Sequence, residues 1–260
     1  MGGMYHWRWL SVALLGSAVL LAQAEEGGEA EPAVSAWSGD MELAYLLKRG
    51  NSESDTFQGK VNAERDGHRW RHTFKGEGAN TETRNDLGEN ERSQERYFAS
   101  YKLDRKLGKD SPNYLFNFLS YEKDLFSGFH YRAAYSLGIG RRWLDNDAHR
   151  LDTEVGPGYR VDCLEPQSGY FSCDNSDETA LARVALKYRW QISENASFTE
   201  EVSSDISGDI TSTRAQTSLT SKINGNFSMR LSHLLIHNTE VPAGTKKADH
   251  EVTASLVYSF

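Results

Sequence analysis

Residues 248–260, ADHEVTASLVYSF, decide the fold of this chain. Side chains of a β-strand alternate between two faces, and here alternate positions separate an apolar face from a polar one. The apolar face consists of His250, Val252, Ala254, Leu256, Tyr258 and Phe260. A chain end normally frays, so an aromatic end indicates a terminus that is buried or recognised. A soluble sandwich could use such a strand, but the stretch favours the closing strand of a membrane β-barrel.

The same alternation recurs in eleven earlier segments. We expect strands at residues 37–48, 55–65, 69–80, 92–104, 113–122, 129–143, 149–161, 178–190, 196–207, 211–223 and 226–238. With the closing segment they make twelve strands of about ten to thirteen residues, long enough to cross a bilayer at a tilt of about 45°. An even number of strands returns both ends of a barrel to one side. The sequence thus predicts an all-β fold, an antiparallel up-and-down transmembrane β-barrel of about twelve strands.

The predicted strand at 113–122 does not reveal which of its faces meets lipid. A shift of one residue exchanges the two faces of a strand, so a clear alternation is needed to orient it. Here the apolar residues occupy both faces: Tyr114, Leu115, Phe116, Phe118, Leu119 and Tyr121. Both orientations of this strand therefore stay open.

Very short polar turns should join the strands at one end of the barrel. Asp66-Gly67, Asn224-Gly225 and the run 145–147 follow three of the even-numbered strands. The longer polar connections follow the odd-numbered strands, as expected outside the cell, so we place the short turns in the periplasm. A girdle of interfacial aromatic residues is expected beside these turns. Three tryptophans of the sequence lie beside these turns: Trp70, Trp143 and Trp190.

The amino terminus predicts export. Residues 1–24 have the pattern of a signal peptide, with a positive start, an apolar core and the small-residue cleavage site Ala22-Gln23-Ala24. Cleavage near Ala24 leaves an acidic lead-in at 25–36, expected to be flexible in the periplasm, and a barrel at 37–260. No apolar run approaches the roughly 18 to 20 residues that a spanning helix needs. A signal peptide followed by barrel-like strands predicts the outer membrane of a Gram-negative bacterium.

Charge and composition narrow the classes of partner. The chain has 29 Lys and Arg against 37 Asp and Glu, a formal charge of −8. Loss of residues 1–24 removes one Arg and no acid, which leaves −9. This acidic balance argues against a nucleic-acid partner. Only 38% of the residues are hydrophobic, as expected for a barrel in which alternate residues face lipid and the interior is polar.

The predicted interior is densely charged, with both signs interleaved around the ring. A lumen of twelve strands lies between filled barrels of eight strands and open porins of sixteen. Its charges could pair into a filled, merely stabilising interior or line a narrow polar conduit, and the sequence leaves both open. The candidates for lining the lumen are Asp40, Glu42, Lys60, Glu64, Arg71, Lys75, Glu77, Arg96, Lys102, Arg132, Arg150, Asp152, Glu154, Arg183, Lys187, Glu201, Asp205, Arg214, Lys222, Arg230 and Glu251.

The two cysteines, Cys163 and Cys173, lie in a polar segment at 162–177. In an exported protein a disulfide is the expected state. Closing this small loop should contribute roughly 2.5 to 3 kcal/mol on the chain-entropy model. Zinc sites need four ligands, so we expect no metal here and no cofactor elsewhere. A disulfide-bearing loop at 162–177 could instead serve as a surface-binding module.

The histidines raise the alternative of an outer-membrane lipid hydrolase. Such an enzyme needs a Ser and a His together on the outer wall of the barrel, and Ser221 with His233 or His237 could supply them. The histidines are scattered singly among strands rich in Ser and Thr, so a Ser near a His is expected by chance. We therefore interpret them as interfacial residues and expect no catalytic residues and no enzyme.

Two stretches resemble a known family. They are Gly50-Asn51-Ser52 with Thr56 in the first hairpin, and SYEKDLFSGFHYRAAYSLGIGRRW at 120–143. Both are similar to the bacterial family called domain of unknown function 481, which includes salt-induced outer-membrane proteins. The resemblance covers about residues 37–260. It implies an outer-membrane barrel and an envelope or salt-stress setting, and it carries over no catalytic residues.

We therefore expect an integral outer-membrane barrel with a charged, narrow lumen, acting as a channel for small solutes or ions or as an envelope-stress component. Its expected partners are outer-membrane lipids and the barrel-assembly machinery, which reads strands that end on an aromatic residue. The residues expected to form this assembly signal are Leu256, Tyr258 and Phe260. We expect a monomer.

Overall fold

The computed structural model describes residues 36–48, 54–84, 90–108, 111–124, 129–166, 173–208, 210–241 and 246–260. The predicted signal peptide at 1–24 and nearly all of the lead-in at 25–36 lie outside them. None of the described residues forms a helix long and apolar enough to cross a membrane. The strands are β1 Ser38–Lys48, β2 Ser54–Asp66, β3 Trp70–Arg84, β4 Asn90–Lys106, β5 Asn113–Asp124, β6 Tyr131–Asp145, β7 His149–Pro166, β8 Cys173–Ser193, β9 Ala196–Ile206, β10 Thr211–Asn224, β11 Phe227–Asn238 and β12 Ala248–Ser259.

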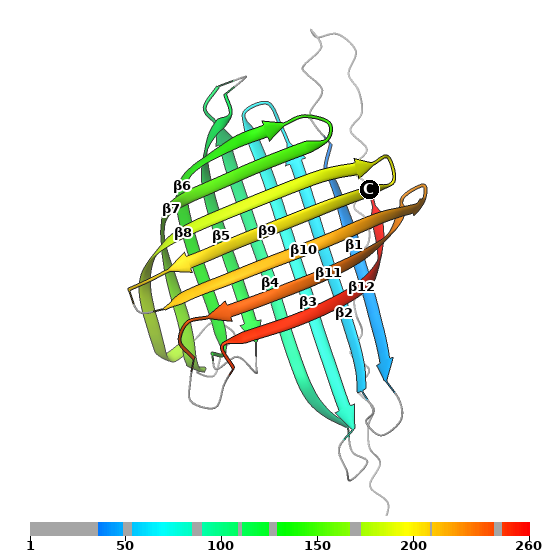
Figure 1. Cartoon of the computed structure of the whole chain (residues 1–260). Helices are drawn as coiled ribbons and strands as arrows, with labels where there is room; N and C mark the ends of the chain where they lie inside the picture. The colour runs from blue at the N-terminus through cyan, green and yellow to red at the C-terminus, as the bar shows by residue number, and fades with distance from the viewer. Residues whose placement is uncertain are drawn as a thin grey trace, which may run out of the picture. The chain divides into compact units, whose positions relative to one another are not determined.

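These twelve strands form one closed antiparallel barrel in which every strand pairs with its neighbours in sequence (Figure 1). The ring closes between β1 and β12, where Met41 lies opposite Tyr258 and Leu43 opposite Leu256. Next to the last register pair, Asp40 and Ser259, Gly39 and Phe260 exchange two backbone hydrogen bonds of 3.0 Å. The predicted up-and-down barrel of twelve strands is therefore confirmed, and β12 is its closing strand.

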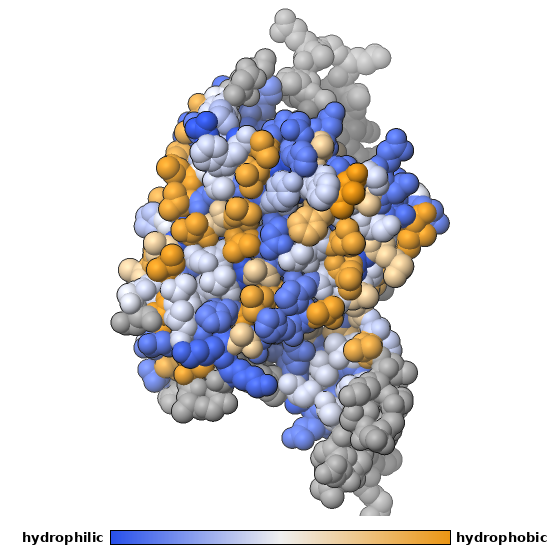
Figure 2. All heavy atoms as spheres, viewed as in Figure 1, coloured by the Kyte–Doolittle hydropathy of each residue, from blue (hydrophilic) through white to orange (hydrophobic). Residues whose placement is uncertain are grey.

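The outer wall is apolar and the interior is polar, the reverse of a soluble protein. Met41, Leu231 and Val252 are 49%, 54% and 70% exposed, whereas Glu42 and Asp104 are 3% and 0% exposed. Figure 2 shows apolar side chains spread over the outer wall. Such a surface is stable only in an apolar solvent, and ring closure pairs the backbone groups that lipid cannot satisfy.

The orientation of β5 is decided by packing inside the barrel. Tyr114 and Phe116 are 4% and 1% exposed, whereas Leu115 and Leu119 are 40% and 54% exposed, so the even-numbered residues point inward. The neighbouring strand β6 makes room for the inward rings. A Cβ at Gly138 would lie 2.9 Å from Cε1 of Phe116, and a Cβ at Gly140 would overlap the ring of Tyr114. Glycines under aromatic side chains are a recurrent device in curved sheets.

Short turns lie at one end of the barrel, called the short-turn end below; the opposite end is the long-loop end. Residues 194–195 and 225–226 are two-residue turns, and 67–69 and 146–148 are only slightly longer. Gly225, in one of these turns, has a φ of 41°, which suits glycine in a hairpin turn. Beside the turns, the predicted aromatic girdle is found on the outer wall: Trp70, Trp143 and Trp190 are 42%, 56% and 40% exposed.

At the long-loop end the strands are longer than the sequence pattern indicates. The strands expected at 69–80 and 92–104 both extend further, because β3 runs to Arg84 and β4 begins at Asn90. Backbone ladders continue into water without apolar side chains, so alternation underestimates strand length there.

The cysteine segment is corrected in the same way. The loop expected at 162–177 is mostly strand, since β7 runs to Pro166 and β8 begins at Cys173, and only 167–172 lie outside the described residues. The predicted disulfide is confirmed: Cys163 and Cys173 are bonded, with their Cα atoms 5.8 Å apart. It ties the ends of two paired strands rather than the base of a large surface loop.

Candidate functional site

A cavity of about 820 Å³ occupies part of the lumen and is lined by residues from all twelve strands. On β3 its lining runs from Arg71 to Glu77, and on β10 from Arg214 to Lys222. Both stretches belong to the part of the strand nearest the short turns. The cavity is therefore the short-turn half of the lumen.

Most of the lumen candidates named from the sequence line this cavity. They are Asp40, Lys60, Glu64, Arg71, Lys75, Glu77, Lys102, Arg150, Asp152, Glu154, Arg183, Lys187, Glu201, Arg214, Lys222 and Arg230. The others lie outside the lining but pair with other polar residues: Glu42 with Arg230, Arg96 with Glu251, Arg132 with Asp162, and Asp205 with Arg183.

Ion pairs cross the lumen from one wall to the other. Lys75 on β3 pairs with Glu201 on β9, and these strands stand six positions apart in a ring of twelve. Glu77 on β3 accepts a hydrogen bond of 2.6 Å from Arg214 on β10. The guanidinium of Arg214 also lies 5.1 Å from the ring centre of Phe98 on β4. Side chains of opposite walls therefore meet in the middle of the bore.

Further contacts extend these pairs into two neighbouring groups, which start from Lys75 and Glu77 of β3 and are together called the cross-lumen network below. Glu201 also binds Lys187 at 2.9 Å, and Arg96 lies 4.0 Å from Glu77 and 3.3 Å from Glu251. The carboxylate of Glu251 also accepts a hydrogen bond from Gln58. The members of the network are Gln58, Lys75, Glu77, Arg96, Lys187, Glu201, Arg214 and Glu251.

Towards the long-loop end the interior is packed with side chains. Ala79, Arg160, Leu181 and Leu234 are 4%, 2%, 6% and 2% exposed. None of these four lines the cavity. The lumen of the described barrel is thus a polar vestibule at the short-turn end that stops at the cross-lumen network.

A second charged cluster lies on the wall of β3, β4, β5 and β7. Arg71 contacts Asp104 at 2.6 Å, and Lys102 approaches the same carboxylate at 3.5 Å. Lys102 also pairs with Glu154, which accepts a hydrogen bond of 2.9 Å from the hydroxyl of Tyr114. The cluster is buried and largely paired within itself, so it stiffens one wall.

Sequence reasoning missed several interior residues. Tyr114 and Phe118 were not assigned to the lumen because β5 is apolar on both faces, although the glycines of the next strand were a usable signal. Arg142 lines the cavity and shares the even parity of the inward residues of β6, so simple alternation extended to the end of the strand places it in the lumen. The register shift begins only beyond it, between Arg142 and Leu144.

The serine and histidine of the hydrolase alternative do not meet. Ser221 lies opposite Met229, whereas His233 lies opposite Thr217 and His237 opposite Thr213. Four residues along a strand separate Ser221 from the level of His233, about 13 Å. Nε2 of His233 instead lies 3.1 Å from Nδ1 of His250 on the outer wall. Within the described part of the chain, no group of three or more His, Cys, Asp or Glu is arranged to hold a metal.

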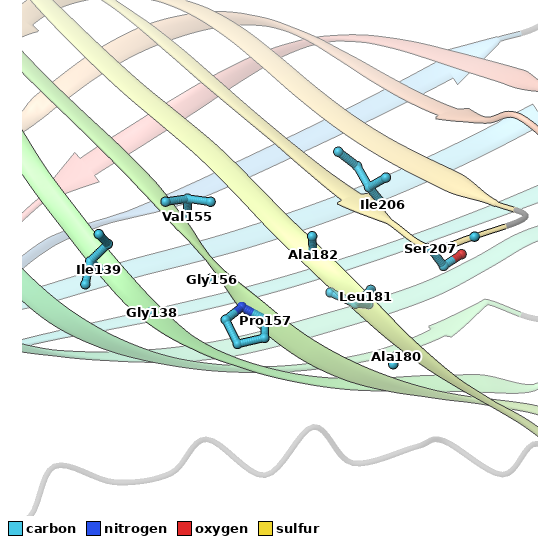
Figure 3. Close-up of a pocket in the computed structure, with 11 residues that line it drawn as sticks. Gly138, Ile139, Val155, Gly156, Pro157, Ala180, Leu181, Ala182, Ile206 and Ser207 are labelled. Carbon is cyan, nitrogen blue, oxygen red and sulfur yellow. The ribbon is translucent and has the colours of Figure 1, made fainter.

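A second recess lies on the outer wall, over β6 to β9 (Figure 3). It has a volume of about 620 Å³ and its lining is mainly apolar. Gly138 and Gly156 line it together with Pro157, Ala180 and Ala182, so small residues leave this part of the wall hollow. It offers no group for chemistry.

A closed ring of antiparallel strands with an apolar outer wall and a charged interior defines a transmembrane β-barrel of the outer-membrane class. Within that class, this chain belongs to the family described as "Protein of unknown function, DUF481", whose model matches residues 41–260. The resemblance inferred from the sequence is therefore confirmed. The chain is 29% identical over 225 residues to the Escherichia coli K12 protein called "Uncharacterized protein YdiY", covering 86% of this chain and 83% of that one.

Several solved outer-membrane structures are similar to it at low identity. The NanC porin is 12% identical with a TM-score of 0.49, over 85% of this chain and 98% of that one. The COG4313 outer membrane channel from Pseudomonas putida F1 is 9% identical with a TM-score of 0.48, over 92% and 100%. The translocator domain of the autotransporter NalP from Neisseria meningitidis is 12% identical with a TM-score of 0.47, over 86% and 88%.

Proposed function

We propose that this protein is a narrow channel for small solutes in the outer membrane of a Gram-negative bacterium, and that the cross-lumen network is its closed gate. The observation that carries the proposal is the combination of a polar cavity of about 820 Å³ with ion pairs that bridge opposite walls just where it ends. A barrel whose interior served only to be filled with side chains would not be expected to keep such a cavity.

The gate can open without moving any strand. An ion pair in contact with water contributes only about 0 to 1 kcal/mol, because solvent screens it and two long side chains must be ordered. Lys75 and Glu201 keep 26% and 27% of their side chains exposed, and Arg214 keeps 23%. Rotation of a few such side chains would therefore widen the bore at small energetic cost.

The test is single-channel conductance in planar bilayers, comparing the wild type with the double variant Glu77→Gln, Arg214→Gln. The two changes roughly preserve side-chain size and leave the net charge unchanged, so their main effect is to remove the attraction across the lumen. We expect more frequent and larger openings. The matched control is Arg92→Gln, Glu95→Gln, an ion pair three residues apart on β4 whose Arg side chain is 50% exposed; it should behave like the wild type.

A sealed barrel that serves as an envelope component under stress is the second candidate, and the packed long-loop half of the interior favours it. The same recordings decide between the two. If neither the wild type nor the Glu77→Gln, Arg214→Gln variant gives conductance steps at any salt concentration, while both migrate as folded, heat-modifiable barrels, the channel is excluded.

A further inference from the structure

The cavity carries the opposite net charge from the protein. The whole chain has 29 Lys and Arg against 37 Asp and Glu. The cavity lining has twelve Lys and Arg against eight Asp and Glu. Its side chains therefore hold four more positive than negative charges, and three acids just outside the lining, Glu42, Asp104 and Asp205, pair with Arg230, Arg71 and Arg183 of the lining. In a narrow space between low-dielectric walls such an excess concentrates anions.

Some of these cations have hydrogen-bond donors that no protein group in the described part of the chain accepts. Lys60 lines the cavity and is 7% exposed, and within the described residues no hydrogen bond or ion pair of its ammonium group is found. Its register neighbours are Glu42 and Glu77, but these carboxylates are engaged by Arg230 and Arg214. Lys60 is thus a buried cation, close to carboxylates already bound elsewhere, with donors facing the cavity.

Two arginines of the lining add further unused donors. Nη2 of Arg142 and Nε of Arg183 are buried and have no hydrogen-bond partner. Arg142 comes from β6 and Arg183 from β8, so donors are available on more than one wall. A buried donor without a partner costs free energy, which an acceptor in the cavity would recover once the arginine side chain turned towards it.

Exposed cations lie at the entrance at the short-turn end, beside the acidic side chains of Asp66 and Glu194. Arg189 and Lys222 line the cavity close to the ends of β8 and β10 and are exposed. Neither makes an ion pair with another of the residues that the structure describes. Both are therefore placed to draw anions towards the interior before the network is reached.

We propose that the cavity binds small multivalent organic anions, carrying carboxylate or phosphate groups, which enter from the short-turn end. The inference rests on the proposed function, because it treats the cavity as the vestibule of the channel and names the class of its solute. The volume of about 820 Å³ suits a ligand of metabolite size, since small-molecule sites span roughly 300 to 1,000 Å³.

The test is calorimetric titration of the folded, detergent-solubilised protein with citrate, and with spermidine as a trivalent probe of opposite charge. We expect citrate to bind more tightly than spermidine, and we expect the affinity for citrate to fall as salt is added. Arg189→Glu with Lys222→Glu should reduce citrate affinity by roughly tenfold or more, since it cancels the charge excess. The control Lys246→Glu with Lys247→Glu makes the same charge change on exposed residues outside the cavity, and it should stay within about twofold.

Two outcomes overturn the inference: spermidine binding as tightly as citrate, or equal loss of citrate affinity in the two charge-reversed variants. A second measurement distinguishes failure of the anion site from failure of the channel. It is the reversal potential of the Glu77→Gln, Arg214→Gln variant in a KCl gradient, which reports whether the current is carried by K⁺ or by Cl⁻. Citrate binding without conductance would exclude the channel and keep the anion site. Conductance selective for K⁺, without citrate binding, would exclude the anion site and keep the channel.

Discussion

At the scale of the residue, buried charge is stable here because most charged groups of the interior have a partner of opposite sign. Asp104 is completely buried and lies between Arg71 at 2.6 Å and Lys102 at 3.5 Å. Burying a lone charge costs several kcal/mol, whereas a paired and hydrogen-bonded one is tolerated. Single members of such pairs should therefore be much harder to replace than charged residues at the rim.

We predict that Asp104→Asn lowers the free energy of unfolding by about 3 to 5 kcal/mol, because it leaves the buried guanidinium of Arg71 without its carboxylate. Urea unfolding of the barrel in detergent measures this. Asp145→Asn is the control: the Asp145 side chain is 52% exposed although it also pairs with an arginine, and its loss should cost at most about 1 kcal/mol. Equal destabilisation by the two changes would contradict the assignment.

At the scale of the element, closure of the ring depends on the last residues of β12. The β1–β12 register spans only Asp40 to Leu43, beyond which Gly39 and Phe260 continue the pairing. A Cβ at Gly39 would lie 2.9 Å from Cζ of Phe260, so the aromatic ring lies close against the glycine. Leu256 and Tyr258 lie on the outer wall at 51% and 41% exposure, and Phe260, 45% exposed, lies at the rim, where it also lines the cavity.

Phe260→Asp should impair insertion while leaving export to the periplasm intact, because it removes the aromatic ring but none of the backbone hydrogen bonds with Gly39. Membrane fractionation and heat-modifiable migration measure this. Ser259→Asp places the same charge one residue earlier, on the opposite face, and should insert at nearly the wild-type level. Normal amounts of membrane-integrated Phe260→Asp protein would count against recognition by the barrel-assembly machinery.

At the scale of the whole molecule, the two ends of the barrel differ, and orientation decides which compartment the cavity faces. The cavity lies at the short-turn end, and short turns are periplasmic in bacterial barrels. We therefore propose that the vestibule opens to the periplasm and that the cross-lumen network separates it from the cell exterior.

Labelling of whole cells with a membrane-impermeant maleimide tests this orientation. Glu194→Cys places a thiol in a short turn, and Lys246→Cys places one in the connection between β11 and β12; the native cysteines are disulfide-bonded and do not react. Only the Lys246→Cys protein should be labelled in intact cells, and both should be labelled after lysis. Labelling of the Glu194→Cys protein in intact cells would reverse the orientation.

Much of the architecture was predictable because it depends on local relations. Alternation predicted all twelve strands and the inward direction of residues such as Lys75 and Glu201, and the Asn224-Gly225 pair predicted a turn that the structure has one residue later, at 225–226. The failures have local causes too: β5 is apolar on both faces, and ladders continue past the last apolar residue.

The sequence by itself determined which face of nearly every strand meets lipid, since a period of two links each side chain to its solvent without reference to any other strand. Only the tertiary structure decided which charges meet. Lys75 and Glu201 are 126 residues apart and lie on strands at opposite sides of the ring, so their contact depends on closure, on the relative shift of all twelve strands and on how far the walls approach. These quantities belong to the ring as a whole, so the cross-lumen network and the cavity become visible only in the closed barrel.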